Sequence, residues 1–335
     1  MKPLLSVIIP CYKVEAYIGT CLQSVWDAVS PENRSAVELV VVDDGTPDNT
    51  PAIVQSFLDG RVSGSGMGAV FVRQQNAGLS EARNSGMRRA AGQYWFFLDS
   101  DDVLFPGAVD RMLDVIRRTQ PDIVEFDARM FADGSDPTAS DRSSLYARYF
   151  RDVAEHKLEG EAKMLRAFEE CRWYVWSRCY RRELFDGERF EAGRLFEDMM
   201  TVPYLYLNRA RIESLPEVLV GYRQNAGSIT ANMSRRHLDD IFYSLQKTLR
   251  RIAGFSGSSA DLSALHILKL KSWRLIVAYS VKRSLKSGNP SWLAAVRRYR
   301  RILKSEYHTD LDWQTAYFTR VLVRRLREKL LRKAA

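Results

Sequence analysis

Three aspartates follow directly on an apolar run in the first third of the chain. Residues 94–98 read Tyr-Trp-Phe-Phe-Leu, and Asp99, Asp101 and Asp102 come next. The bulky run predicts a buried strand of a parallel sheet. In an extended chain, side chains two residues apart point the same way and lie about 6.5 to 7 Å apart. We therefore expect Asp99 and Asp101 to face one ligand together and Asp102 to point elsewhere.

The chemistry that suits two such carboxylates is the binding of a hard cation. Ligands of open α/β sheets bind beyond the carboxyl ends of the strands, which is where these acids are expected. Mg²⁺ and Mn²⁺ commonly bind through one or two carboxylates together with substrate phosphates, so the implied ligand is a nucleotide diphosphate. The alternative is a solvated acidic turn, which an isolated Asp-Ser-Asp would favour.

The elements that would position these acids alternate between strands and helices. Strands are expected at residues 4–9, 37–42, 69–73, 94–98 and 122–126, with helices between them. This order predicts a parallel, doubly wound, Rossmann-like α/β sheet with right-handed crossovers. A further helix is expected to open at residues 193–200, around Glu197 and Asp198, and two short strands are expected at 212–215 and 218–222.

The composition bounds the architecture and the class of partner. The chain has 335 residues, of which 46% are hydrophobic, and this length exceeds the usual size of a single core. We expect an α/β domain over residues 1–233 and a basic helical region over residues 234–335. The formal charge of +9 and the isoelectric point near 9.4 favour an anionic partner, which would be a phosphate-bearing ligand or a membrane surface.

Cysteine usage and hydropathy indicate the compartment. Cys11, Cys21, Cys171 and Cys179 form no Cys-x-x-Cys pair, which favours reduced thiols in a cytoplasmic protein over disulfides or zinc ligands. The amino terminus is expected to form a strand rather than a signal peptide. No uninterrupted apolar window of about 18 residues occurs, so no membrane-spanning segment is expected.

Several short motifs occur in an order and spacing shared with a known family. They lie at residues 6–10, 41–45, 76–84, 97–102 and 197–199. Over roughly residues 3–230, these motifs resemble glycosyltransferase family 2, the inverting sugar transferases with a GT-A fold found in bacterial polysaccharide biosynthesis. Lys13 stands where relatives often have Asn, and Arg178 stands where they often have Lys.

The resemblance implies a nucleotide-sugar site. Its residues would be Pro10, Tyr12, Asp44, Asn76, Gly78, Arg83 and Asp99. Asp44 would accept a hydrogen bond from the uracil ring, with Pro10 and Tyr12 shaping the base pocket. Arg83 would offer its guanidinium to a phosphate or to Asp99. The alternative for Arg83 is a salt bridge on a helix surface.

The resemblance also implies a metal ion and a general base. Asp101, together with Asp99, would hold Mn²⁺ or Mg²⁺, which neutralises the leaving diphosphate. Asp198 is the candidate base that deprotonates the acceptor hydroxyl opposite the leaving group, and Glu197 is the alternative base. On a helix these neighbours would diverge by about 100°, so only one would face the donor. The structural alternative for the pair is acidic charge at a helix N-terminus.

The carboxyl-terminal region is strongly basic. From residue 293 onwards, twelve Lys and Arg residues outnumber four acidic residues. Phe318, Leu322, Leu326 and Leu330 form an apolar stripe at helical spacing beside arginines. Such a helix either lies on an anionic leaflet or packs its stripe on the catalytic domain. Nucleic-acid binding is disfavoured because no nucleic-acid motif accompanies the charge.

The motifs and the resemblance together predict a metal-dependent, inverting hexosyltransferase. It would move a sugar from a UDP-sugar to a glycan acceptor, free or lipid-linked, in capsular or exopolysaccharide assembly. The enzyme would be cytoplasmic, either free or peripheral at the inner face of the plasma membrane. One alternative is a nucleotidyltransferase, which would carry a Gly-rich phosphate loop where this chain has residues 10–13. The other is a non-catalytic membrane scaffold that binds sugar nucleotides.

Overall fold

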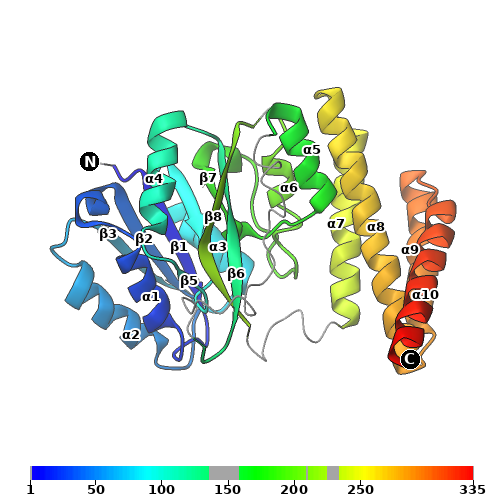
Figure 1. Ribbon diagram of the computed structural model, residues 1–335, viewed down its shortest axis with the longest axis horizontal. Coiled ribbons are helices and arrows are strands. Elements are labelled where there is room, and N and C mark those ends of the chain that lie inside the picture. Colours follow the sequence, from blue (N-terminus) through cyan, green and yellow to red (C-terminus); the bar gives the residue numbers. More distant parts are fainter. Residues whose placement is uncertain (1, 136–157, 209, 225–233, 335) are drawn as a thin grey trace. The chain divides into compact units, whose positions relative to one another are not determined.

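The computed structural model describes residues 2–135, 158–208, 210–224 and 234–334 (Figure 1). The chain divides into two compact units. The first unit comprises Met1–Arg166 and Arg172–Asn232, and the second comprises Ala167–Cys171 and Met233–Ala335.

The first unit is built on a sheet that has eight strands within the described residues, in the order β3-β2-β1-β4-β7-β6-β8-β5. The strands are β1 Leu5–Cys11, β2 Val37–Asp43, β3 Gly68–Arg73, β4 Tyr94–Phe97, β5 Val103–Leu104, β6 Ile123–Ala132, β7 Arg178–Arg181 and β8 Ile212–Gln224. Strands β1 to β4 pair in parallel, and so do β6 and β8. Strand β7 is antiparallel to β4 and β6, and β5 is antiparallel to β8. The predicted mostly parallel α/β sheet is confirmed.

Helices cover both faces of this sheet. The helices that precede residue 210 are α1 Ile18–Asp27, α2 Thr50–Phe57, α3 Leu79–Arg89, α4 Ala108–Thr119, α5 Gly160–Glu170 and α6 Val202–Leu205. Strands β1 and β2 are buried throughout, as expected for central parallel strands. Leu5, Val7 and Ile9 share a core with α1 and α4 on one face. On the other face α3 lies so close that a Cβ on Gly86 would overlap the side chain of Ile8.

Two local predictions are wrong. Residues 193–201 form turns, so Glu197 and Asp198 do not open a helix, and α6 begins only at Val202. Phe196 has a φ of 60°, which lies outside the right-handed helical region. The two strands expected after residue 211 are one strand, β8, whose register against β6 shifts on either side of Asp127. The break in the hydrophobic pattern at Pro216 and Glu217 therefore marks an irregularity in the pairing and not a strand end.

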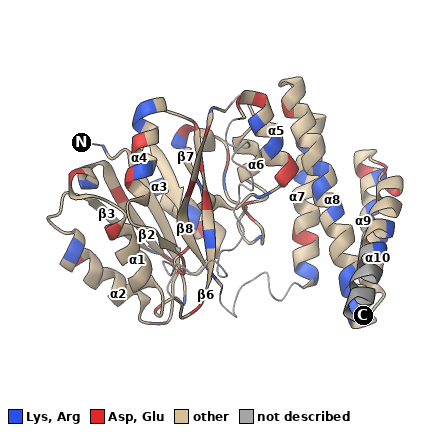
Figure 2. Cartoon of the chain, viewed as in Figure 1, with Lys and Arg blue, Asp and Glu red and all other residues tan. Residues whose placement is uncertain are grey.

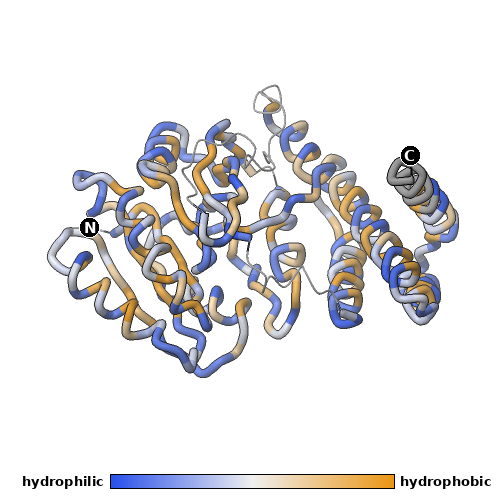
Figure 3. The backbone as a smooth tube through the Cα atoms, turned by 60° about the horizontal axis from the view of Figure 1, so that its bottom comes forward, coloured by the Kyte–Doolittle hydropathy of each residue, from blue (hydrophilic) through white to orange (hydrophobic). Residues whose placement is uncertain are grey.

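The second unit is helical, as predicted. Its helices are α7 Arg235–Ala253, α8 Ser259–Ser287, α9 Ser291–Tyr307 and α10 Asp312–Ala334. The expected breaks near 254–259 and 287–290 are present, and a further one separates α9 from α10. Hydrophobic and hydrophilic residues alternate along α7 and α8 (Figure 3), so each helix buries one side. Among the described helices, none combines the length and the apolarity that crossing a bilayer requires.

Candidate functional site

Asp44, the first residue after β2, ties together the loops that follow β2 and β3. Its buried carboxylate accepts hydrogen bonds from Gln74 Nε2 at 2.7 Å, from the Ala77 backbone N–H at 2.9 Å and from the Gly78 backbone N–H at 2.8 Å. The side-chain amide of Asn76 donates to the Asp44 carbonyl at 2.9 Å. The structure thus brings Asp44, Asn76 and Gly78 into one loop pair at the carboxyl edge of the sheet.

Gly45 allows the loops after β2 and β3 to approach each other closely. Its φ is +69°, and an added Cβ would lie 2.8 Å from the Asn76 backbone nitrogen and 3.0 Å from the Gln74 carbonyl oxygen. We expect Gly45→Ala to lower the free energy of unfolding by about 1 to 3 kcal/mol. Urea unfolding measures the change. Gly60→Ala is the control, because a Cβ there meets no atom within 4 Å; equal losses at both sites would contradict the proposed packing.

Asp43 precedes Asp44 in the chain, and Pro10 and Tyr12 are the other residues predicted to shape the base pocket. These three residues differ in burial. Asp43 is buried and accepts hydrogen bonds from the Thr46 backbone N–H at 2.9 Å and from Arg73 Nε at 3.1 Å. Those contacts give Asp43 a structural part in the turn after β2. Pro10 is buried within β1, whereas Tyr12 just beyond it leaves 42% of its surface exposed. Tyr12 therefore leaves part of its side chain accessible to solvent.

The acidic turn after β4 is held from the end of β8. Asp102 is fully buried and accepts a hydrogen bond from the Arg223 backbone N–H at 2.8 Å. The Arg223 side chain donates to the Asp101 carbonyl at 2.7 Å and to Asp133 Oδ1 at 3.1 Å. Burial first, and then the charges of Asp101 and Asp99, raise the pKa of Asp102 well above its usual value. Asp102 thus points into the protein, while Asp99 and Asp101 stay partly exposed.

Arg83 on α3 joins the acidic turn to the segment that carries Glu197. Its side chain is 2% exposed and donates to Asp99 Oδ1 at 2.6 Å and, through its other terminal nitrogen, to Glu197 Oε1. Burial acts to lower the pKa of Arg83, but the charges of Asp99 and Glu197 overcome it and raise the pKa. Arg83 is therefore a buried cationic bridge and not a salt bridge on a helix surface.

Asp198 follows Glu197 in the same turn and titrates differently from an ordinary aspartate. Its Oδ1 accepts a hydrogen bond from the Met199 backbone N–H at 2.8 Å. Burial first, and then the charge of Glu197, raise the pKa of Asp198 from 3.8 to about 7, against the lowering effect of Arg83. Glu197 pairs with Arg83. The two neighbouring acids therefore have different surroundings, although they lie in a turn and not on the helix expected from the sequence.

The donor set at this edge fits a cation that shares its coordination shell with phosphates. Within the described residues no three His, Cys, Asp or Glu side chains gather closely enough to hold a metal ion by themselves. Mg²⁺ and Mn²⁺ often take only one or two carboxylates and complete their shell with water and substrate phosphates. Asp99 and Asp101 supply such oxygens on a partly exposed turn, with one oxygen of Asp99 bonded to Arg83.

Two residues that build the site were missed in the sequence. Gln74 bonds Asp44, and Arg223 holds the turn of Asp101 and Asp102. Gln74 lies two residues before a recognisable motif, which is a weak signal. Arg223 lies at the carboxyl end of β8, more than 120 residues from its partners, and no local pattern marks it.

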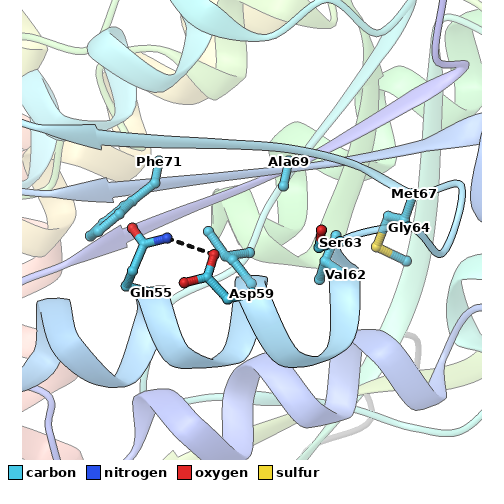
Figure 4. Close-up of a pocket in the computed structure, with 9 residues that line it drawn as sticks. Gln55, Asp59, Val62, Ser63, Gly64, Met67, Ala69 and Phe71 are labelled. Carbon is cyan, nitrogen blue, oxygen red and sulfur yellow. Dashed lines mark hydrogen bonds between the residues drawn. The ribbon is translucent and has the colours of Figure 1, made fainter.

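A separate cavity of about 360 Å³ lies between α2, the π-helical turn Leu58–Val62 and the edge strand β3 (Figure 4). Its lining residues are Gln55, Leu58, Asp59, Val62, Ser63, Gly64, Met67, Ala69 and Phe71. None of the predicted site residues lines it. A hydrogen bond of 2.9 Å between Gln55 and Asp59 lies on one wall.

Comparison with known proteins gives a consistent picture. The family model described as Glycosyl transferase family 2 matches residues 6–181. The chain is 32% identical over 237 residues to the uncharacterized glycosyltransferase EpsJ of Bacillus subtilis, covering 69% of this chain and 64% of EpsJ. It is 36% identical over 115 residues to the putative teichuronic acid biosynthesis glycosyltransferase TuaG of the same organism, covering 34% of this chain and 42% of TuaG. The chain thus spans less than two thirds of either relative.

Among solved structures, S. aureus TarS 1-349 in complex with UDP-GlcNAc has a similar fold. The TM-score is 0.66 at 20% sequence identity, over 90% of this chain and 81% of that one. At this identity the likeness concerns the fold.

Proposed function

This chain belongs to glycosyltransferase family 2, and we propose that it transfers a hexose-type sugar from a UDP-sugar to a glycan acceptor. Surface polysaccharide assembly is the proposed setting, in line with the teichuronic acid biosynthesis for which TuaG is named. A UDP-sugar donor is in line with the ligand in the TarS complex. The family resemblance drawn from the sequence motifs is confirmed.

The observation that carries the proposal is the bridge made by Arg83. It connects Asp99, at the carboxyl end of β4, with Glu197, whose neighbour is Asp198. One buried guanidinium thereby holds Asp99, assigned to the donor side, and Glu197, which lies next to the proposed base. Single displacement at an anomeric carbon needs the leaving group and the base at opposite sides of one small site.

On the donor side, the loop pair would bind the nucleotide. A carboxylate offers about four lone-pair sites, and three protein donors reach Asp44. The remaining one would accept the uracil N–H, with Tyr12 and Pro10 beside the base and Asn76 and Gly78 completing the loop. Asp99 and Asp101 would hold Mn²⁺ or Mg²⁺, which supplies Lewis-acid neutralisation of charge on the diphosphate.

On the acceptor side, Asp198 would be the general base. Its carboxylate takes the proton of the acceptor hydroxyl as the oxygen bonds to the anomeric carbon and the bond from that carbon to the diphosphate oxygen breaks. The attack comes from the face opposite UDP and inverts the anomeric centre. A base with a pKa of about 7 is well matched to this step near neutral pH. Glu197, held by Arg83, would position Asp198.

The basic helices of the second unit would favour an anionic membrane surface. We therefore infer that the acceptor is a lipid-linked glycan. Such an acceptor would draw the enzyme to the inner face of the plasma membrane as a peripheral protein. Capsular and exopolysaccharide chains are the product classes.

Release of UDP from a panel of UDP-sugars, assayed with glycan acceptors and Mn²⁺, tests the proposed function. We expect chelation of divalent cations to abolish release and added Mn²⁺ or Mg²⁺ to restore it. Asp101→Ala should lower the rate about 100-fold or more, because diphosphate departure loses several kcal/mol of charge stabilisation. Asp114→Ala, an exposed acid on α4, should be neutral. Full activity in chelator, or no UDP release with any donor, would disprove the proposal.

A further inference from the structure

Charge is distributed unevenly along the chain. Residues 234–335 hold 23 of the 50 Lys and Arg residues but 7 of the 41 Asp and Glu residues, so their formal charge is +16, whereas residues 1–233 have −7. Figure 2 shows Lys and Arg along all four helices of the second unit. The basic excess of the whole protein therefore resides in the helical unit.

Helix α10 has two distinct faces. On one face, Thr315 accepts a hydrogen bond from Trp273 Nε1 of α8 at 3.0 Å, and Phe318 and Leu322 are half-buried. This is the described part of the apolar stripe expected to lie on a membrane or on the catalytic domain; Leu326 and Leu330 lie outside the described side chains. Thr315, Phe318 and Leu322 share the side of α10 that faces α8. The described part of the apolar stripe is therefore not on the exposed side of the helix.

The opposite face of α10 is exposed and combines aromatic with basic side chains. Trp313 and Tyr317 are 70% and 49% exposed, and Arg320 and Arg324 are exposed as well. Positions 313, 317, 320 and 324 recur at intervals of four, three and four residues, so they share one helix face. The Trp313 and Tyr317 rings stack in parallel with centroids 5.4 Å apart. We call these four residues the α10 aromatic-basic face.

Two acids beside the start of α10 pair with basic side chains of α9. Asp310 pairs with Lys304 at 3.6 Å, and Asp312 pairs with Arg300. Trp and Tyr favour the boundary between water and lipid because their rings are apolar at one end and polar at the other. Basic side chains near an anionic leaflet each contribute about 1 kcal/mol. Charge and ring chemistry thus fit the same surface, an anionic lipid headgroup layer.

We propose that the α10 aromatic-basic face docks on membranes that contain anionic lipid. The biological purpose, reaching a lipid-linked acceptor, rests on the proposed function, but the docking itself does not require catalysis. Trp313 and Tyr317 enter the headgroup boundary, and Arg320 and Arg324 pair with lipid phosphates.

Cosedimentation of the full chain with vesicles tests this face. We expect binding to vesicles of phosphatidylcholine with phosphatidylglycerol and little to phosphatidylcholine alone. Arg320→Gln with Arg324→Gln should weaken partitioning about 30-fold. Arg297→Gln with Arg301→Gln is the charge-matched control, since both residues are exposed on α9. Trp313→Ala with Tyr317→Ala should also weaken binding, whereas Leu285→Ala, which removes a side chain that is 63% exposed on α8, should not.

Equal losses in the α9 and α10 charge variants would overturn the proposal, because net charge and not this face would then bind the vesicles. Failure of the wild type to bind anionic vesicles, or binding to RNA in their place, would also overturn it. UDP release with a soluble acceptor should be unchanged in the α10 variants. If the wild type binds vesicles but releases no UDP, the proposed function fails and the docking face stands.

Discussion

Asp198→Asn is expected to lower the rate of sugar transfer about 10²- to 10⁴-fold while leaving UDP affinity unchanged. The substitution keeps the size of the side chain but removes the carboxylate that would accept the proton of the acceptor hydroxyl. UDP affinity should persist, because the nucleotide would bind through the Asp44 loop pair. Steady-state kinetics with calorimetric titration of UDP separate the two effects.

The pH profile tests the same assignment. The pKa of Asp198 is raised to about 7, so its basic, charged form grows as pH rises through that value. The wild-type rate should therefore climb up to about pH 7 and level off above it. Between 3.8 and about 7 the folded protein keeps a proton that the unfolded chain releases, so this group's contribution to stability falls as pH rises through that window.

Glu197→Gln is the matched control for Asp198→Asn. Glu197 should act through its bond to Arg83, so this variant should be slower yet keep the rising limb of the pH profile. Loss of the limb in Glu197→Gln with its retention in Asp198→Asn would exchange the two roles.

Arg83→Gln is expected to lower the free energy of unfolding by about 3 to 5 kcal/mol. Removing the guanidinium leaves Asp99 and Glu197 facing one another without the charge that compensates them. The amide of glutamine cannot span both carboxylates. Urea unfolding measures the change, and transfer activity should fall with it, because both acids lose their fixed positions.

The control for Arg83 lies one helical turn and a residue further along α3. Arg88 forms an exposed pair with Glu81 at 2.7 Å, and an exposed pair contributes about 1 kcal/mol or less. Arg88→Gln should therefore be nearly neutral. If Arg83→Gln and Arg88→Gln lower the free energy of unfolding by the same small amount, the Arg83 bridge does not stabilise the site as proposed. Arg83→Lys should recover part of the stability, because it keeps the charge but not the two-pronged geometry.

Sequence patterns predicted the sheet because its central strands are specified locally. Runs such as residues 39–42 and 94–98 are apolar on both faces, which suits strands covered on both sides. The acids that follow them therefore had to lie at one edge of the sheet, and Asp44 and Asp99 do follow β2 and β4 there. The order of the short motifs identified the family because each motif is also a local feature of the sequence.

The helix expected around Glu197 is not formed, and long-range contacts constrain the chain just ahead of it. Asn84 of α3 donates to the Phe190 carbonyl at 2.9 Å and accepts from its backbone N–H at 3.1 Å, which fixes the chain ahead of the turn. These bonds hold the chain at Phe190, ahead of the expected helix, and they join residues 106 positions apart, so no local pattern predicts them.

By itself, then, the sequence determined the family, the mostly parallel sheet and the strand ends that carry Asp44 and Asp99. Tertiary structure alone decided that Arg83 meets Glu197 across 114 residues, that Arg223 holds the Asp101 turn, and that Trp313 faces outward. The physical reason is that hydrophobic periodicity is written along the chain. The pairing of buried charges depends on which distant segments the folded core brings within hydrogen-bond reach.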